Sequence, residues 1–476
     1  MRSKMMAKRT ILSALAATIA IGVATVPAAT ANQNAPATRC PEHLLLAIPG
    51  TTETSEGADP SEPHGILSNV TNPLIDQYPS TVLQTFYVPY MSVIVDDKAQ
   101  TYGTSKQQAI RNASQEINDR AAECPHTKFG LTGFSQGADA AGDLASEIGN
   151  GHGPIGRDRM FAVGLMADPG TQKGAGKALG APTTGVGFAG ARPEGFGALN
   201  DIAVNVCAEE DLYCNTPEQS IGTQFMGSLG SRIDAQDPVK SVAAIITTLL
   251  GLDGVPITST LDALNQSVVS GNFLAVPQLA MELSGHVSKL TNEVAYKAVP
   301  GSDVGAIAAS TTRLTDAASR GDILAVTRLV GELTPHLITF ASQFAKTVGD
   351  LIARLPINEY VAVGATITRI SANAAIQNYG AIPLDLGKLV GQLNNAVRKT
   401  LRALPLDQFP MLNRMADELT PGRVLDEVLN YATFLAVDSH NSYASAPINA
   451  SGRTGAEELV NYFRTQIDNG GQGIAA

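Results

Sequence analysis

Residues 127–149 read TKFGLTGFSQGADAAGDLASEIG and predict a short apolar strand that leads directly into a helix of small residues. At the junction, Gly133, Ser135 and Gly137 form the G-x-S-x-G pattern of a nucleophile elbow. A tight turn of this kind holds a serine hydroxyl clear of the backbone, and the flanking glycines leave room for the sharp bend. The positive end of the helix dipole lies near a developing oxyanion. The pattern predicts Ser135 as a nucleophile; the alternative is a purely structural turn.

Runs of apolar and β-branched residues elsewhere predict four more strands. They lie at 43–48, 82–88, 159–166 and 201–207. Helices are expected at 65–78 and at 104–123, the second capped by Thr104 or Ser105, and the glycine-rich stretch 170–199 is expected to be loop. Strands that alternate with helices indicate an α/β fold with a mainly parallel, five-stranded sheet and helices on both faces. Sites in such sheets lie at the carboxyl ends of the strands. The loops after residue 48, after the elbow strand and after Cys207 should therefore meet.

The composition changes from residue 222 to residue 430, where leucine and alanine recur at helical spacing without cysteine. The run Gly271–Val276 recurs as Gly321–Val326 at an offset of 50 residues, and the match continues to His286 and His336. A fainter third copy begins at Lys388. Such repeats predict helical hairpins packed into an all-α bundle. The paired histidines suggest a metal site as an alternative, but repeated residues on one helical face are more often packing positions.

The N-terminus has the pattern of a secretory signal peptide. Four basic residues precede an apolar run from Ile11 to Val26, and Ala29-Thr30-Ala31 gives an A-x-A cleavage site. We expect residues 1–31 to be removed and the protein to be secreted or held at the cell envelope. Removal of the four basic residues changes the formal net charge from −11 to −15, which argues against nucleic acid as a partner.

Four cysteines, an even number in an exported chain, suggest two disulfides. Three pairings are possible, and the short separation of Cys207 and Cys214 favours their pairing, which leaves Cys40 with Cys124. No histidine or second C-x-x-C pair accompanies them, so their spacing does not suggest zinc. No metal or cofactor is expected.

A serine nucleophile needs a base, and the base needs an orienting carboxylate. In α/β-hydrolases the chain order is serine, then acid, then histidine. Asp211 follows the last predicted strand, and His440 is the histidine in a loop-like setting after it. The alternative acids are Asp168, Glu209 and Glu210; the histidines that precede the acid, and so fit the order poorly, are His43, His64, His126 and His152.

The sequence resembles the cutinase family of serine esterases in its motifs. They are GFSQG at 133–137, C-x-x-x-D-x-x-C at 207–214, H-x-x-Y at 440–443 and GTTET at 50–54. The four cysteines also fall where the family has its two disulfides. The resemblance implies that Ser135 is the nucleophile, Asp211 the acid and His440 the base. It also implies an oxyanion hole formed by Thr51 and the N–H of Gln136, although a loop threonine that caps its own backbone is the alternative for Thr51.

The resemblance covers about residues 32–220 and 432–470, with the helical region 222–430 inserted between acid and base. We therefore expect a hydrolase domain in two parts, 32–221 and 431–476, with a last helix at 455–466. Both ends of the insertion lie beside the acid or the base, so the bundle is expected to cap or flank the active site; a spacer that points away is the alternative.

The predicted activity is hydrolysis of carboxylic esters, small-molecule or lipid, through an acyl-serine intermediate. A phospholipase A or acyl thioesterase of the cell envelope is the second candidate, and an inactive binding protein on a hydrolase scaffold is the third. The sequence leaves the acyl-chain length and the oligomeric state open.

Overall fold

The computed structural model describes residues 40–232, parts of 260–403 and residues 439–470. The gaps within these ranges are 95–99, 181, 182, 193, 219, 262, 265, 268–271, 294–302 and scattered positions between 353 and 379. The expected signal peptide, the segment that returns from the insertion before residue 439 and the tail after residue 470 lie outside the described residues.

A parallel sheet forms the centre of the α/β domain, with strand order β2-β1-β3-β4-β6-β5. The strands are β1 (His43–Ile48), β2 (Leu83–Tyr87), β3 (Lys128–Phe134), β4 (Met160–Met166), β5 (Lys177–Leu179) and β6 (Ala203–Val206). Each strand predicted from the sequence is present. The order in which strands are added to the sheet reverses at β1, because β2 pairs with one edge of β1 and β3 with the other. Ligands of such sheets bind at the carboxyl ends of the strands beside this switch point.

The prediction of five strands was wrong, because six are described. The additional strand, β5, lies within 170–199, where the sequence predicts loop. It has three residues at the edge of the sheet, two of them exposed, so it carries no buried alternation for a sequence pattern to detect.

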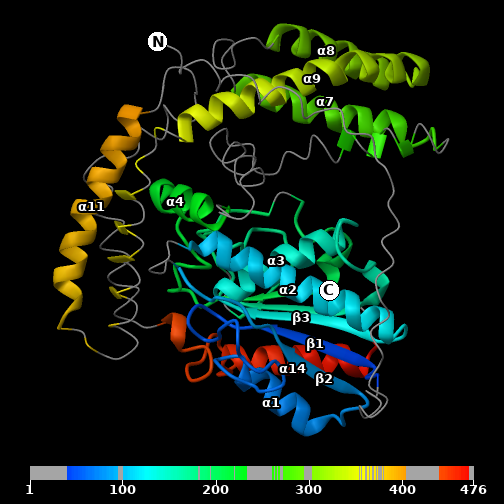
Figure 1. Ribbon diagram of the computed structural model, residues 1–476. Coiled ribbons are helices and arrows are strands. Elements are labelled where there is room, and N and C mark those ends of the chain that lie inside the picture. Colours follow the sequence, from blue (N-terminus) through cyan, green and yellow to red (C-terminus); the bar gives the residue numbers. More distant parts are fainter. Residues whose placement is uncertain are drawn as a thin grey trace, which may run out of the picture. The chain divides into compact units, whose positions relative to one another are not determined.

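Helices cover both faces of the sheet (Figure 1). Figure 1 shows α2 (Tyr102–Glu123) and α3 (Gln136–Gly149) on one side, and α1 (Ser68–Gln77) and α14 (Gly455–Asp468) on the other. Leu44, Leu46 and Ile48 pack in one apolar core and Leu45 and Ala47 in the other, so every residue of β1 is buried. A strand that is apolar throughout is typical of a sheet covered on both faces.

The cap of α2 differs from the prediction. The helix begins at Tyr102, and its N-cap is Thr101, whose side-chain oxygen accepts a hydrogen bond from the N–H of Thr104. The sequence offers hydroxyl side chains at 101, 104 and 105, and any of them suits an N-cap. The position is decided by where the chain enters the helix, which no local preference specifies.

The two expected disulfides are confirmed. Cys40–Cys124 joins a residue three positions before β1 to the C-cap of α2, and Cys207–Cys214 closes the loop that follows β6.

The described part of the insertion is helical. Its elements include α4 (Ile221–Arg232), α7 (Val276–Glu293), α8 (Val304–Ser319), α9 (Ile323–Ile352) and α11 (Ile382–Ala403). Helix α8 packs against both α7 and α9. The repeat has a structural counterpart, because Val276 and Val326 are buried, as are Leu283 and Leu333.

Helix α9 includes a segment, Ile323–Phe340, that is long and apolar enough to cross a membrane by length and composition alone. Its buried residues follow helical spacing at Val326, Leu329, Val330, Leu333, Leu337 and Phe340. A single buried stripe of this kind is typical of a helix that packs in a protein core.

Candidate active site

The elbow between β3 and α3 has the backbone geometry that the motif predicts. Ser135 has φ +53° and ψ −122°, a strained conformation for a residue with a side chain. A Cβ atom on Gly133 would lie 2.3 Å from the carbonyl oxygen of Gly137, and one on Gly137 would lie 1.9 Å from that of Ile48. No larger residue fits at either position, so the two glycines permit the close approach of α3 to β1 that presents Ser135.

A chain of hydrogen bonds joins the three residues predicted to act together. His440 Nε2 lies 2.8 Å from Ser135 Oγ, and His440 Nδ1 lies 2.8 Å from Asp211 Oδ2. Because an ionised carboxylate only accepts hydrogen bonds, Nδ1 donates to Asp211. This leaves Nε2 as an acceptor facing the serine hydroxyl.

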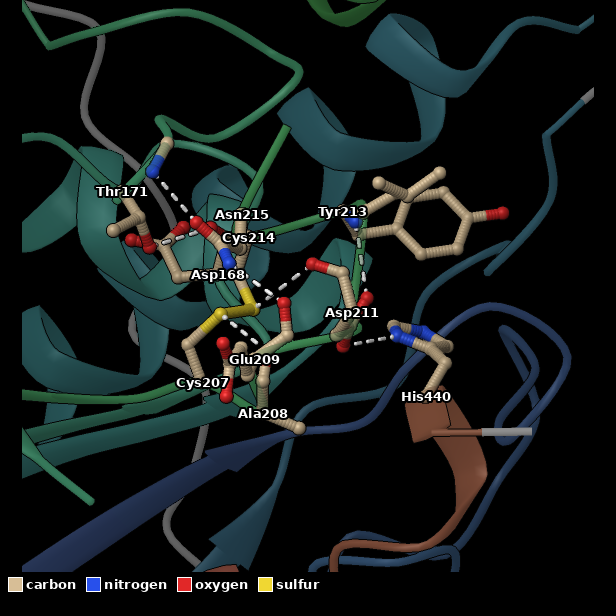
Figure 2. The surroundings of a disulfide bond; sticks show 12 residues. Asp168, Thr171, Cys207, Ala208, Glu209, Asp211, Tyr213, Cys214, Asn215 and His440 are labelled. Carbon is tan, nitrogen blue, oxygen red and sulfur yellow. Dashed lines mark hydrogen bonds and ion pairs between the residues drawn. A yellow bond between two sulfur atoms is a disulfide. The ribbon is translucent and has the colours of Figure 1, made fainter. Parts of the chain in front are cut away.

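Asp211 is fully buried in the loop closed by the Cys207–Cys214 disulfide (Figure 2). Its Oδ1 accepts a hydrogen bond from the N–H of Tyr213, and its Oδ2 accepts one from the hydroxyl of Tyr443 as well as the one from His440. Three donors therefore fix the carboxylate in both position and rotation.

Aromatic rings flank the imidazole. The ring of Phe134 stacks on that of His440 with centroids 5.0 Å apart, and the ring of Tyr213 lies 4.4 Å away at a tilt of 49°. Phe134 immediately precedes Ser135 and Tyr213 belongs to the loop of Asp211, so the segments that carry Ser135 and Asp211 also hold His440.

The predicted oxyanion residues lie together beside Ser135. The hydroxyl of Thr51 donates to Oε1 of Gln136 at 3.4 Å. The amide of the Gln136 side chain donates to the carbonyl oxygens of Val93 and Tyr102, so this side chain serves to fix the surrounding loops. The N–H of Gln136 is in the first turn of α3, where helical N–H groups have no acceptor within the helix.

Glu53, in the same loop as Thr51, is a partly buried carboxylate with a structural role. Its Oε2 accepts a hydrogen bond from the N–H of Gly50 at 2.8 Å and its Oε1 accepts one from the N–H of Ile66 at 2.7 Å. Burial is the main cause that raises the pKa of Glu53 above its ordinary value, with the two backbone donors opposing it. The carboxylate thus joins the loop 50–54 to the turn before α1.

The alternative acids and bases are placed elsewhere. Asp168 forms two hydrogen bonds with the guanidinium of Arg192, and Glu209 and Glu210 are exposed. His43 is buried in β1, while His126 and His152 are exposed. On the insertion, His286 is half-buried and His336 exposed, and in the described part of the chain no group of three or more His, Cys, Asp or Glu side chains is arranged to hold a metal ion.

Sequence reasoning assigned no role to Glu53, Tyr443 or Arg192. The first two stand in the quoted motifs GTTET and H-x-x-Y, so their spacing from Thr51 and His440 was the available signal. Arg192 stands in a glycine-rich stretch, and nothing in its neighbourhood indicates that it is buried.

Known proteins resemble this part of the chain. The cutinase family model matches residues 59–228. A carboxylesterase Culp6 homolog of Corynebacterium glutamicum is 30% identical over 205 residues, which cover 37% of this chain and 66% of that protein. Cutinase 11 of Verticillium dahliae is 28% identical over 201 residues, covering 40% and 65% of the two chains.

A third relative is an acetylxylan esterase of Hypocrea jecorina, which is 27% identical over 217 residues that cover 41% of this chain and 69% of that protein. The chain thus spans slightly less than two thirds of the first two relatives. The domain that contains residues 59–228 therefore matches the cutinase family model, and this part of the chain is similar to carboxylesterases and cutinases.

Proposed function

We propose that this protein hydrolyses carboxylic esters through an acyl-enzyme intermediate on Ser135. The observation that carries the proposal is the continuous hydrogen-bonded chain from Ser135 Oγ through His440 to Asp211, at the carboxyl ends of β3 and β6. The family relatives named carboxylesterase, cutinase and acetylxylan esterase support the same class of reaction.

The geometry supports a two-stage reaction. In the first stage Ser135 Oγ attacks the ester carbonyl while its proton passes to His440 Nε2. The C–O bond to the alcohol then breaks, and His440 returns the proton to the departing oxygen. In the second stage water attacks the acyl-serine, gives a proton to the same nitrogen, and the carboxylic acid leaves as Ser135 recovers its proton.

Asp211 and the oxyanion donors support these steps. Asp211 holds His440 with Nδ1 protonated and stabilises the imidazolium that forms in each stage. We assign the N–H of Gln136 to the oxyanion, together with the hydroxyl of Thr51, whose single proton turns to it from Gln136 Oε1. One such donor is worth roughly 3 kcal/mol of transition-state stabilisation. The sequence of steps needs no cofactor.

The substrate we propose is an ester with an acyl chain, acted on outside the cytoplasm. The N-terminal sequence pattern favours export, and disulfides persist in oxidising compartments. Among lipids, the proposed substrates are acylglycerols and other lipid esters of the cell envelope. A phospholipase A or acyl thioesterase activity is the second candidate.

A fluorophosphonate probe tests the nucleophile directly, because it reacts with a serine that a histidine activates. We expect the wild-type protein to be labelled and Ser135→Ala to remain unlabelled. A matched control is Ser146→Ala, which removes a different serine of α3. An unlabelled wild-type protein, or equal labelling of Ser135→Ala, would favour the inactive binding protein.

A chain-length series then separates the substrate candidates. The rates for p-nitrophenyl esters, acylglycerols, phospholipids and acyl thioesters of matched chain length are compared in the same assay. Highest kcat/KM for simple esters supports the carboxylesterase, and a preference for phospholipids or thioesters supports the second candidate.

A further inference from the structure

Tyr443 is a fully buried residue three positions after His440, and it contacts the acid as well as the base segment. Its hydroxyl lies 2.8 Å from Asp211 Oδ2 and 2.8 Å from the backbone nitrogen of Ala208. Both partners belong to the Cys207–Cys214 loop. One hydroxyl therefore bridges the start of that loop and its central carboxylate.

The direction of both hydrogen bonds is fixed by chemistry. A backbone N–H only donates and an ionised carboxylate only accepts, so the hydroxyl accepts from Ala208 and donates its single proton to Asp211. Burial, followed by the negative charge of Asp211, raises the pKa of Tyr443 well above its ordinary value. The hydroxyl therefore keeps this proton throughout the working range of an esterase.

The ring of Tyr443 is held in place from several sides. It packs edge-on against Phe134 with ring centroids 6.2 Å apart, and a Cβ atom on Gly455 would lie 2.7 Å from its Cδ1. The carbonyl oxygen of Tyr443 accepts a hydrogen bond from the N–H of Ala456, in the first turn of α14. A side chain fixed in this way imposes its geometry on Asp211 and does not merely follow it.

We propose that Tyr443 is a positioning residue of the ester hydrolysis proposed above: its hydroxyl fixes the rotation of the Asp211 carboxylate so that Oδ2 receives His440 Nδ1. Without this donor, the carboxylate keeps only the N–H of Tyr213 and the imidazole as partners. Its rotation is then less restricted, and the fraction of molecules with His440 aligned on Ser135 falls. Because His440 acts in the chemical steps, the loss appears in kcat and not in KM.

The experiment compares Tyr443→Phe with Tyr462→Phe. Tyr462 is a matched control because it is also buried, and its hydroxyl donates to the carbonyl oxygen of Ile202 at 2.5 Å, away from the triad. We expect Tyr443→Phe to lower kcat roughly tenfold with little change in KM, as for loss of one hydrogen bond to a charged group. Tyr462→Phe should leave both constants unchanged while losing comparable thermal stability.

A second pair of variants shows whether Tyr443 acts through Asp211. In an Asp211→Asn background, we expect Tyr443→Phe to cause no further loss in the rate of fluorophosphonate labelling, since effects that share one path are not additive. Replacement of Tyr443 by p-aminophenylalanine keeps the ring and a donor, and should hold kcat within about threefold of wild type.

The outcomes separate this inference from the proposed function. A wild-type protein without hydrolase activity overturns the proposed function and this inference with it. An active wild type with unchanged kcat in Tyr443→Phe overturns only the inference. So does a folded p-aminophenylalanine variant as slow as Tyr443→Phe, or a full multiplicative loss in the Asp211→Asn background.

Discussion

The Arg192 guanidinium forms a two-point hydrogen bond with the Asp168 carboxylate, from Nη1 to Oδ2 at 2.7 Å and from Nη2 to Oδ1 at 2.9 Å. Arg192 also contacts Asp139 and Asp143 of α3, and Lys106 of α2 contacts the same two carboxylates. This cluster lies one helical turn after Ser135, because the N–H of Asp139 donates to the Ser135 carbonyl. It joins α2, α3 and the loop after β4 close to Ser135.

The cluster has three carboxylates and two cations, so one negative charge is uncompensated among its members. Burial is the main cause that raises the pKa of Asp139 to about 6. The folded protein therefore binds this proton more tightly than the unfolded chain does. The contribution of Asp139 to stability is largest at low pH and decreases as the pH rises through about 6.

Asp139→Asn tests this pH dependence. The variant lacks the proton-binding group, so we expect the melting temperature of wild type relative to the variant to be more favourable at pH 5 than at pH 7.5. Thermal unfolding of both proteins across this range provides the measurement, with exposed Asp158→Asn as the control. A difference that is constant, or that grows toward high pH, contradicts the assignment.

Asp211→Asn should reduce kcat by about 10³- to 10⁴-fold, because an amide can donate to Nδ1 and so favours the wrong imidazole tautomer. Glu209→Gln is the matched control, since Glu209 is an exposed carboxylate of the same disulfide loop. We expect its kcat to equal that of wild type. If the two variants lose activity equally, the orienting role belongs to the loop and not to Asp211.

Glu53→Gln should loosen the loop that carries Thr51, because a side-chain amide has only one acceptor oxygen for the N–H groups of Gly50 and Ile66. We expect kcat to fall roughly tenfold, less than for complete removal of an oxyanion donor. Exposed Glu62→Gln is the control.

The raised pKa of Glu53 leads us to expect a pH effect on activity. Since burial raises the pKa of Glu53, its carboxylate becomes protonated at a higher pH than an exposed glutamate and loses one acceptor site. Wild-type kcat should therefore decline on acidification through that pH, and Glu53→Gln should lack this component. Identical profiles, after scaling, count against the role of the carboxylate.

The two disulfides should differ in their effects, one mainly on stability and the other mainly on kcat. Cys40–Cys124 spans a sequence separation of 84 and Cys207–Cys214 one of 7. The chain-entropy estimate gives about 4 to 5 kcal/mol for the longer closure and about 2 to 3 kcal/mol for the shorter one. We expect paired alanine variants at Cys40 and Cys124 to lose more stability in urea, and those at Cys207 and Cys214 to lose more kcat. The reverse order would refute this division.

The role of the inserted helices is tested by excision. Helix α4 packs on α2, and Ser231 Oγ lies 3.5 Å from Lys106 Nζ, so α4 should be retained and residues 233–430 replaced by a short linker. If the insertion forms part of the substrate site, kcat/KM for long acyl esters should fall more than for acetyl esters. An unchanged ratio places the insertion outside the substrate site.

Local patterns predicted much of this structure. β1, β3 and β4 are mostly apolar and almost wholly buried, and the elbow is marked by Gly133 and Gly137, so their positions follow from composition and backbone sterics. The pairing of His440 with Asp211 followed from the chain order of the triad and the quoted motifs. β5 was missed because a three-residue edge strand has almost no buried face.

The burial of charged side chains could not be predicted from local patterns, for a different reason. Arg192 is buried because Gly142 and Gly170, from two other segments, leave room for its guanidinium, as a Cβ atom on either would lie within 2.5 Å of it. Such a site exists only after the segments have packed. Likewise, the hydroxyl of Tyr443 contacts a residue 232 positions away in the sequence, Asp211, so no local pattern indicates the contact.

The hydrogen bond between Asp211 and His440 joins residues 229 positions apart. In synthesis from the N-terminus, Ser135 and Asp211 emerge long before His440, and α14, which covers one face of the sheet, emerges later still. A contact of such long range is entropically expensive and forms late in folding. The nascent chain therefore cannot complete the hydrogen-bonded chain from Ser135 to Asp211 until the segment with His440 has docked, and a copy truncated before residue 440 lacks it altogether.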